Sequence, residues 1–467
     1  MSGYFKITTF GCQMNKSDSE RLKSLLAASG MSEAADDDSA DLLVYNTCSV
    51  RQTAEDRIYG VHHALHARKE KNPDLLVAVT GCMAGRDTDG KIKARLPLVD
   101  LFFPTEEMVY LPKRISELRP ALIDPNATQS ESEYDHYLKI KPSYQNQFQA
   151  YIAISNGCNK FCTYCVVPFS RGRQKDRPAH DVISEAHDRA TNGCKEVTIL
   201  GQTVNLYNPP DKDSAFRADN PFDRSKNCFG ALMWELNQIE GIERIHFTAP
   251  HPHHMDSETI AALTLPKHVN YLHLPVQSGS NEVLKRMNRP YTREQYIEII
   301  KNVRAARPDI AIGTDIIVGF CGETEAQFEE TVSLYRECDF DIAYLARYSQ
   351  RSGTAAVRMY KDDISKLEKK RRWIFLQHLM EETVLRKNQR FTDTIVEVFV
   401  ESCEKGLCSG NSREMKRVIF AGSDDLVGTI VSVKIDRAIE WVLYGSLVVS
   451  ERTAESHVPG HAVSMQL

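Results

Sequence analysis

The chain has 467 residues, of which 42% are hydrophobic and 26% are charged, and its formal net charge is −5. The length and composition are typical of a globular protein of about two to four domains. Because the net charge is negative, the overall charge of the chain does not attract nucleic acid. No apolar run reaches the roughly 18 residues that span a membrane, and residues 1–10 lack the features of a signal peptide. We therefore expect a cytoplasmic protein with no membrane partner, whose twelve cysteines stay reduced without forming disulfides.

Residues 1–140 alternate strand-like and helix-like segments. The predicted elements, in chain order, are a strand at 4–10, a helix at 17–29, a strand at 41–46, a helix at 51–70 and a strand at 75–80. This alternation predicts an α/β domain with a parallel sheet.

A cysteine follows each of the three predicted strands, namely Cys12, Cys48 and Cys82. Ligands of an open parallel sheet bind outside the carboxyl ends of its strands. Three thiols at three such ends could converge on one metal site. The alternative is three buried cysteines, because free cysteine is among the most buried residue types.

Residues 124–149 are polar and poorly periodic, which predicts a linker. The second domain, expected at residues 145–380, repeats a strand–helix unit six times. Its predicted strands lie at 151–155, 197–200, 244–248, 271–275, 311–318 and 342–348. Six such units predict a parallel, partial (βα)6 barrel with functional groups at the carboxyl ends of the strands. Residues 207–230 interrupt the repeat and predict a surface loop that acts as a lid or contacts substrate.

The third domain, expected at residues 386–450, consists of short alternating segments. Strands are predicted at 394–400, 415–421, 427–435 and 440–449, with turns at 410–411 and 422–424. The pattern predicts a small β-barrel.

Three cysteines with the spacing C-x3-C-x2-C follow the first strand of the six-unit repeat. They are Cys158, Cys162 and Cys165. Zinc sites usually need four ligands, and no fourth Cys or His stands at a matching distance. Three thiolates suit a [4Fe–4S] cluster with one iron left open, because such clusters are held by thiolates. Gly157 and Asn159 permit the sharp backbone of such a loop.

This motif, with an aromatic residue before its last cysteine and at the start of a partial βα barrel, resembles the radical S-adenosylmethionine (SAM) superfamily. The resemblance implies that Cys158, Cys162 and Cys165 hold a cluster whose open iron chelates SAM. It also implies SAM contacts from strand-end segments, and the residues that match are Tyr164, Gly201, Gln202, Gln277, Ser278 and Asp315.

Further segments resemble methylthiotransferases of the MiaB type, and the likeness runs along the whole chain. Residues 9–15, 46–51 and 81–84 match the three N-terminal motifs of that family. The resemblance implies that Cys12, Cys48 and Cys82 hold a second [4Fe–4S] cluster. It also implies that the third domain is a TRAM domain, a small β-barrel that binds RNA.

Three places depart from the family pattern without touching a cluster ligand. Residues 174–177 read Gln-Lys-Asp-Arg where Glu-x-Ser-Arg is usual, Cys321 stands where Pro is usual, and Gly85 stands where Gln is common.

The resemblance also implies a reaction. One SAM supplies a methyl group to sulfur at the N-terminal cluster, and a second yields an adenosyl radical that abstracts hydrogen from carbon 2 of the target adenine. The implied product is 2-methylthio-N6-isopentenyladenosine at position 37, in the anticodon stem-loop of tRNA. An electron donor and a sulfur source are further expected partners, and we expect a monomer.

RNA contact needs local cations, because the net charge of the chain is negative. The densest group is Lys369, Lys370, Arg371 and Arg372, beside Trp373, and a smaller group is Arg413, Lys416 and Arg417. The first group is equally compatible with a solvated helix face that packs Trp373 inward.

Several other side chains have weaker signals. His251, His253 and His254 follow a strand and indicate a polar loop facing substrate more than a metal site. Five further cysteines are expected to have no function, namely Cys194, Cys228, Cys338, Cys403 and Cys408.

Two other functions remain open. One is a methylthiotransferase that acts on threonylcarbamoyl-adenosine in tRNA or on a ribosomal protein. The other, from a different class, is a non-catalytic iron–sulfur regulator that binds RNA.

Overall fold

The computed structural model describes residues 3–50, 52–124, 136–225 and 227–448. The chain divides into two compact units, residues 1–378 and 379–467. No helix within the described ranges has both the length and the apolar character of a membrane span.

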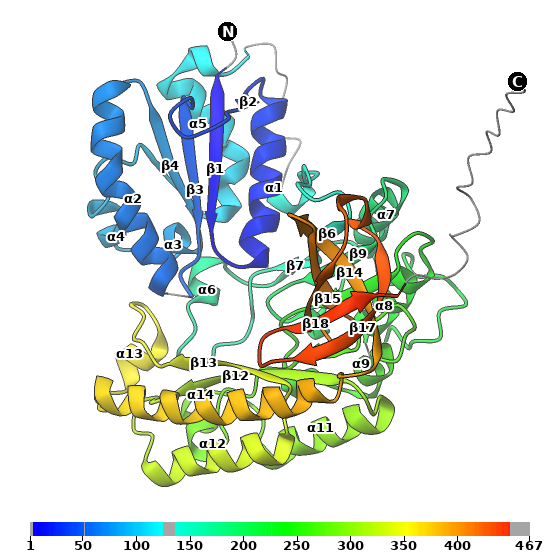
Figure 1. Ribbon diagram of the computed structural model, residues 1–467. Helices are drawn as coiled ribbons and strands as arrows, with labels where there is room; N and C mark the ends of the chain where they lie inside the picture. Colours follow the sequence, from blue (N-terminus) through cyan, green and yellow to red (C-terminus); the bar gives the residue numbers. More distant parts are fainter. Residues whose placement is uncertain (1–2, 51, 125–135, 226, 449–467) are drawn as a thin grey trace, which may run out of the picture. The chain divides into compact units, whose positions relative to one another are not determined.

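The first unit begins with a five-stranded parallel sheet (Figure 1), as the alternation in the sequence predicted. Its strands, in spatial order, are β2 (Ser32–Glu33), β1 (Tyr4–Phe10), β3 (Leu42–Thr47), β4 (Leu76–Gly81) and β5 (Leu101–Phe102). The short edge strands β2 and β5 were not predicted, because two residues give no periodic signal.

Helices cover both faces of this sheet, with α1 (Gln13–Ala28) and α5 (Leu111–Leu118) on one face and α2 (Gln52–Lys71) on the other. Successive side chains of a strand point to opposite faces. Leu42 and Val44 of β3 therefore pack in the core with α1, while Leu43 and Tyr45 pack with α2. Burial on both sides explains the unbroken apolar runs of β3 and β4. Short helices complete this part, namely α3 (Cys82–Gly85), α4 (Lys91–Ala94), η1 (Thr105–Tyr110) and η2 (Pro120–Leu122).

The predicted linker at 124–149 is wrong at its centre. Residues 125–135 lie outside the described part, but η3 (Tyr137–Lys139) follows them. Tyr137, Leu138 and Ile140 are buried in the core that α1 shares with the sheet. Three apolar side chains in a polar stretch were too few to show a period.

The first unit continues with six parallel strands arranged as two three-stranded sheets. The sheets are β6 (Gln149–Ala153), β9 (Glu196–Leu200) and β10 (Arg244–Phe247), and then β11 (Tyr271–His273), β12 (Ala311–Val318) and β13 (Ile342–Arg347). A parallel bridge between Ile245 and His268 joins the two sheets. The strands thus follow one another in chain order, as the predicted partial (βα)6 barrel requires.

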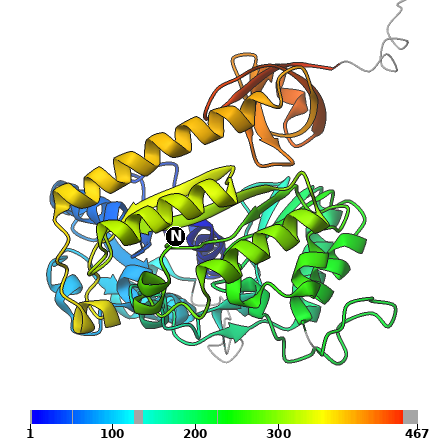
Figure 2. The same cartoon turned by 90° about the horizontal axis from the view of Figure 1, so that it is seen from below.

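Helices follow these strands and lie along them in Figures 1 and 2. They are α7 (Ala179–Thr191), α8 (Cys228–Gln238), α9 (Ser257–Ala262), α10 (Asn281–Arg286), α11 (Arg293–Ala306) and α12 (Glu325–Cys338), with α13 (Ala355–Met359) and the long α14 (Lys366–Gln389) after β13. Thr292 and Gln295 form a capping box at the start of α11. Such reciprocal bonds satisfy two N–H groups that a helix start otherwise leaves without partners.

The loop at 207–230 is held against two of these helices. The Asp211 carboxylate accepts hydrogen bonds from the backbone N–H groups of Ala179 and His180, at 2.7 and 3.0 Å, at the start of α7. Asn220 donates to Glu235 of α8 at 2.9 Å.

The second unit contains a closed barrel of five strands, one more than predicted. They are β14 (Ile395–Glu404), β15 (Leu407–Ser412), β16 (Arg417–Ala421), β17 (Ile430–Ala438) and β18 (Leu443–Leu447), and η6 (Asp424–Leu426) precedes β17. The predicted turn at 410–411 is wrong, because Gly410 and Asn411 belong to β15. A Cβ on Gly410 would lie 1.8 Å from the Phe399 carbonyl oxygen, so close strand contact explains this glycine.

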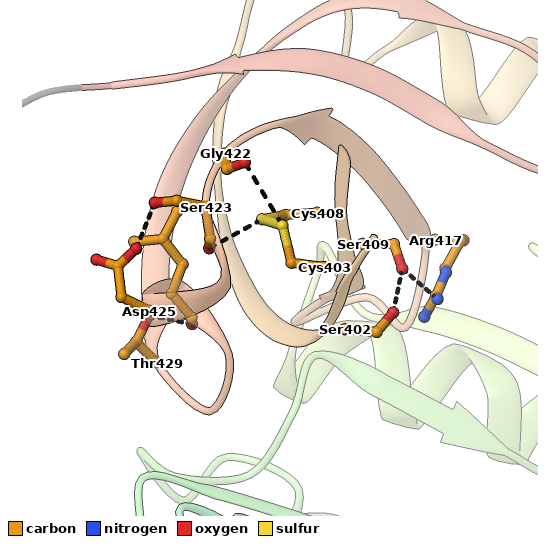
Figure 3. The surroundings of a disulfide bond; sticks show 10 residues. Ser402, Cys403, Cys408, Ser409, Arg417, Gly422, Ser423, Asp425 and Thr429 are labelled. Atoms are coloured by element: carbon orange, nitrogen blue, oxygen red, sulfur yellow. Dashed lines mark hydrogen bonds between the residues drawn. A yellow bond between two sulfur atoms is a disulfide. The ribbon is translucent and has the colours of Figure 1, made fainter. Parts of the chain in front are cut away.

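Cys403 and Cys408 form a disulfide across β14 and β15, where they are direct partners in the register (Figure 3). The prediction of a chain without disulfides is therefore wrong for this pair. Their Sγ atoms each lie 3.5 Å from a carbonyl oxygen, those of Gly422 and Ser423. The spacing alone did not indicate that a hairpin turns between them.

Candidate cluster-binding sites

The first trio of cysteines lies at the carboxyl ends of three neighbouring strands. Cys12 follows β1 and caps the N-terminus of α1, Cys48 follows β3, and Cys82 begins α3 directly after β4. The sheet places β1, β3 and β4 side by side. The predicted convergence of these thiols is consistent with this arrangement.

Two glycines allow the backbone to turn closely at this edge of the sheet. A Cβ on Gly11 would lie 2.3 Å from the Asn15 side-chain oxygen. Gly81 has φ +96°, and a Cβ there would lie 2.5 Å from the Thr47 carbonyl oxygen. A side chain at either position would therefore clash with the neighbouring segment of this sheet edge.

The three sulfurs interact electrostatically. A hydrogen bond to the Cys48 side chain lowers the pKa of Cys12 to about 6 and that of Cys82 to about 6, and the charge of Arg171 lowers both further. The side chains of Cys12 and Cys82 raise the pKa of Cys48. The lowered pKa values of Cys12 and Cys82 favour their thiolates, which are the form that binds metal.

The second trio lies in the loop after β7 (Ser155–Asn156), which pairs with β8 (Lys175–Asp176). Gly157 has φ +76°, and a Cβ there would lie 2.2 Å from the Arg173 carbonyl oxygen, so this position requires glycine. Cys158 is buried, and Cys162 and Cys165 are half-buried.

N–H groups point at these sulfurs. The backbone N–H of Lys160 donates to Cys158 at 3.3 Å, and that of Val167 donates to Cys165 at 3.5 Å. Burial raises the pKa of Cys165 to about 12. Hydrogen bonds of this kind stabilise the negative charge of a cluster and its ligands.

Both trios suit a [4Fe–4S] cluster by their donors, three sulfurs each. Within the described ranges, no three His, Cys, Asp or Glu side chains are grouped so as to hold a single metal ion. A cuboidal cluster distributes its thiolate ligands over separate irons, so the absence of a single-ion geometry is compatible with a cluster.

Most of the residues predicted to contact SAM lie in segments that follow strands of the barrel, and Asp315 lies within β12. Gly201 and Gln202 follow β9, and a Cβ on Gly201 would lie 2.7 Å from the Ser155 hydroxyl. Gln277 has φ +73° and continues β11 towards β12, where its N–H donates to the Asp315 carbonyl at 2.8 Å.

The side chains of the other predicted SAM residues have partners of their own. The Ser278 hydroxyl is buried 3.3 Å from that of Thr331 in α12. The Asp315 carboxylate lies 3.2 Å from the His273 ring. The Tyr164 ring packs in an apolar cluster with Met287 and Phe320.

The three histidines lie at and around η5 (Pro252–His254), which follows β10. Burial lowers the pKa of His251 to about 2 and that of His254 to about 4. These rings are therefore neutral. The Nε2 atom of each is buried without a hydrogen-bond partner, so a polar group of a ligand could pair with it.

The basic residues predicted to contact RNA differ in exposure. In α14, Lys369 and Arg372 are buried and ion-paired, with Asp362 at 2.6 Å and Glu323 at 2.8 Å. Lys370 and Arg371 are exposed, and Trp373 is turned inward, where it donates to the Leu345 carbonyl at 3.0 Å.

In the small C-terminal barrel, two of the three basic side chains lie beside acidic ones. Arg413 lies 3.5 Å from Glu397, and Arg417 is paired with Glu401. Lys416 also has a partner.

Two arginines donate hydrogen bonds to cysteine sulfurs, and the sequence did not predict these contacts. Arg171 donates to Cys82 at 3.1 Å, and Arg289 donates to Cys162 at 3.3 Å. Each comes from a segment distant from its cysteine, and a single arginine has no spacing that could reveal the contact.

Two families match separate parts of the chain. Residues 152–335 match the radical SAM superfamily, and residues 4–104 match a family described as uncharacterized protein family UPF0004.

Curated relatives match almost the whole chain. A tRNA-2-methylthio-N(6)-dimethylallyladenosine synthase from Thermoanaerobacter sp. (strain X514) is 40% identical over 454 residues, which cover 95% of this chain and 93% of the relative. A protein of the same name from Geobacillus kaustophilus (strain HTA426) is 39% identical over 451 residues, covering 95% and 82%.

Solved structures resemble the fold. A radical S-adenosylmethionine methyltransferase from Kitasatospora setae, TsrM, solved with cobalamin and a [4Fe-4S] cluster bound, has a TM-score of 0.52. It is 14% identical and the match covers 74% of this chain and 72% of that chain, so the likeness shows the fold alone.

Proposed function

This chain belongs to the family of the tRNA-2-methylthio-N(6)-dimethylallyladenosine synthases, and we propose that it transfers a methylthio group to carbon 2 of N6-isopentenyladenosine at position 37 of tRNA. It is a radical SAM enzyme that uses two [4Fe–4S] clusters and SAM. When bound, the clusters and SAM supply electron transfer, a methyl group and radical chemistry for substitution at an unactivated carbon.

We assign the cluster ligands residue by residue. Cys158, Cys162 and Cys165 hold the cluster that binds SAM, and Cys12, Cys48 and Cys82 hold the auxiliary cluster. Three thiolates leave one iron of each cluster open to a small ligand. The protein's part is to hold these thiolates, to orient SAM and the adenine, and to exclude water.

The observation that carries the proposal is the packing of a segment beside one cysteine trio against a segment beside the other. α3, which begins with Cys82, packs on α6 (Val167–Ser170), which follows Cys165. A Cβ on Gly85 would lie 2.1 Å from the Ser170 carbonyl oxygen. The glycine that departs from the family pattern therefore allows close contact between the segments that hold the two trios. Transfer of sulfur to a carbon radical requires such proximity.

Residues at and near the carboxyl ends of the barrel strands suit the recognition of SAM and adenine, because ligands of parallel barrels bind there. Gly201 and Gln202 follow β9, Gln277 follows β11, and Asp315 lies within β12 beside Gln277. We assign SAM contact to these residues and to Tyr164. Since the Ser278 hydroxyl is directed to α12, we assign this serine contact through its backbone.

The tRNA partner needs cations outside the cluster sites. We assign phosphate contact to Lys370 and Arg371, with the barrel residues Arg413, Lys416 and Arg417 as a second group. We further propose that the chain works as a monomer in the cytoplasm and receives electrons and sulfur from separate donors.

Mass spectrometry of tRNA nucleosides tests the proposed product. A strain that lacks the gene should accumulate N6-isopentenyladenosine, and expression of this chain should restore its 2-methylthio derivative. Restoration of the 2-methylthio derivative of threonylcarbamoyl-adenosine, or methylthiolation of a ribosomal protein, would identify the corresponding alternative substrate.

A SAM-cleavage assay separates the enzyme from a regulator. Anaerobically reconstituted protein should cleave SAM, and Cys158→Ala should abolish the cleavage. A protein that binds tRNA and clusters yet leaves SAM intact would be a regulator.

A further inference from the structure

Arg171 lies between the two cysteine trios and is almost completely buried, with 2% of its surface exposed. It directly follows α6, six positions after Cys165 in the sequence. A buried arginine keeps its charge, because the guanidinium does not lose its proton in proteins. Each of its N–H groups therefore needs an acceptor.

The guanidinium finds its acceptors in the N-terminal part of the chain and beside it. Nε donates to Cys82 Sγ at 3.1 Å, Nη2 donates to Asp18 Oδ2 at 2.5 Å, and Nη1 donates to Asn156 Oδ1 at 3.1 Å. Asp18 is as deeply buried as Arg171, with 1% of each side chain exposed. The carboxylate balances the positive charge and fixes the plane in which Nε reaches the sulfur.

The backbone beside Arg171 contacts the other trio. The N–H of Cys158 donates to the Gly172 carbonyl at 3.1 Å, and the Asn156 amide donates to the Arg171 carbonyl at 3.3 Å. The segment that fixes the start of the Cys158 loop thus also presents a charged N–H donor to Cys82. A displacement of Arg171 would disturb both sites.

We propose that Arg171 is a positioning residue for the auxiliary cluster, whose guanidinium holds Cys82 as a ligand and raises the reduction potential of that cluster. The proposal rests on the proposed function, since it assumes that Cys82 binds iron. Hydrogen bonds to ligand sulfurs and nearby positive charge stabilise the more reduced and more negative state of a cluster. Lysine has the charge but lacks the planar fork that reaches Cys82 and Asp18 together.

The test isolates the auxiliary cluster in the full-length chain. The triple variant Cys158→Ala/Cys162→Ala/Cys165→Ala is reconstituted anaerobically, and it should contain about four irons per chain. Arg171→Gln, Arg171→Lys and Asp18→Asn are added separately to this background. Arg289→Gln is the matched control, because it removes the corresponding arginine donor from the other trio.

The readouts are the midpoint of an electrochemical titration followed by electron paramagnetic resonance, and the rate of iron loss to a chelator. Arg171→Gln should lower the midpoint and speed iron loss about tenfold or more, as removal of partners behind a metal ligand does. Arg171→Lys should lie between Arg171→Gln and the background. Asp18→Asn should shift both readouts in the same direction as Arg171→Gln, and Arg289→Gln should shift neither.

The outcomes distinguish the two proposals. A background protein that binds no cluster while its circular dichroism is native refutes the auxiliary site and, with it, the role of Arg171. The other outcome is a background protein that binds a cluster. If the folded variants Arg171→Lys and Asp18→Asn then have the same midpoint and the same rate of iron loss as this background, the role of Arg171 alone is refuted. The two milder variants keep the test decisive if Arg171→Gln does not fold.

Discussion

Arg289 Nη1 donates a hydrogen bond to Cys162 Sγ across 3.3 Å, although the two residues lie 127 positions apart in the chain. The Arg289 Nε donates to the Tyr291 hydroxyl at 2.8 Å, which in turn donates to the Val276 carbonyl at 2.9 Å. A network from the rim of the barrel thus directs a positive charge at one sulfur of the second trio.

We predict that Arg289→Gln lowers the rate of SAM cleavage by about 10- to 100-fold, because partners behind a metal ligand typically have effects of this size. Arg289→Lys should retain part of the rate, since it keeps the charge. Both predictions are checked by measuring the iron content and the rate of SAM cleavage of the reconstituted wild-type protein and variants. Wild-type rates in Arg289→Gln with a full complement of iron would show that the hydrogen bond is incidental.

The exposed part of the basic group in α14 should contribute to tRNA affinity, and the buried part should contribute to folding. We predict that Lys370→Ala/Arg371→Ala weakens tRNA binding and lowers the slope of log affinity against log salt by about 1 for each phosphate that the variant no longer neutralises. Filter binding between low and moderate salt measures that slope.

A matched control removes two exposed positive charges elsewhere. Lys301→Ala/Arg336→Ala changes α11 and α12 by the same charge. It should leave the slope unchanged. Equal slopes in all three proteins would exclude this face of α14 as a phosphate-binding surface.

Glu20 should make the stability of the first unit depend on pH. Burial raises its pKa from 4.5 to about 7, despite hydrogen bonding to the Gln145 N–H and the nearby charges of Arg21 and Arg189. The folded state therefore binds the proton more tightly than the unfolded state, so stability falls as pH rises from about 4.5 through about 7.

We predict that Glu20→Gln removes this dependence and stabilises the first unit above pH 7 by roughly 2–4 kcal/mol, since one pKa unit corresponds to about 1.4 kcal/mol. Denaturant unfolding at about pH 5, 6, 7 and 8 measures the free energy of unfolding of the wild-type protein and of Glu20→Gln. Parallel pH profiles of the wild-type protein and the variant would contradict the prediction.

The disulfide between Cys403 and Cys408 should stabilise the barrel. Its cysteines are five positions apart, and closing so short a loop corresponds to about 2 kcal/mol in the chain-entropy account. We predict that Cys403→Ser/Cys408→Ser lowers the unfolding free energy of the barrel by about that amount, and that a reductant lowers it in the wild-type protein alone. If all twelve cysteines react as thiols in denatured, unreduced protein, the disulfide does not form.

The sequence predicted the features that repeat along the chain. Strands β1, β3 and β4 are rich in apolar and β-branched residues, and a cysteine follows each of them. Parallel pairing brings their carboxyl ends together. The spacing C-x3-C-x2-C likewise identified its loop, because the three sulfurs need no contact with distant segments to be recognised.

Features that depend on contacts between distant residues could not be predicted. The neighbour of Cys82 that donates to its sulfur is 89 positions away, and the partner of Arg372 is 49 positions away. Lys369 and Arg372 are buried because one face of α14 packs on the partial (βα)6 barrel. A run of four basic residues does not show which face of the helix is buried. Gly410 resembles a turn residue until the close approach of β14 is known.

The iron content of anaerobically reconstituted protein tests the central claim most directly. The wild-type chain should hold about eight irons, and about four should remain in Cys12→Ala/Cys48→Ala/Cys82→Ala and in Cys158→Ala/Cys162→Ala/Cys165→Ala. If either triple variant keeps the iron content of the wild-type chain, the claim of two clusters on two separate trios is contradicted.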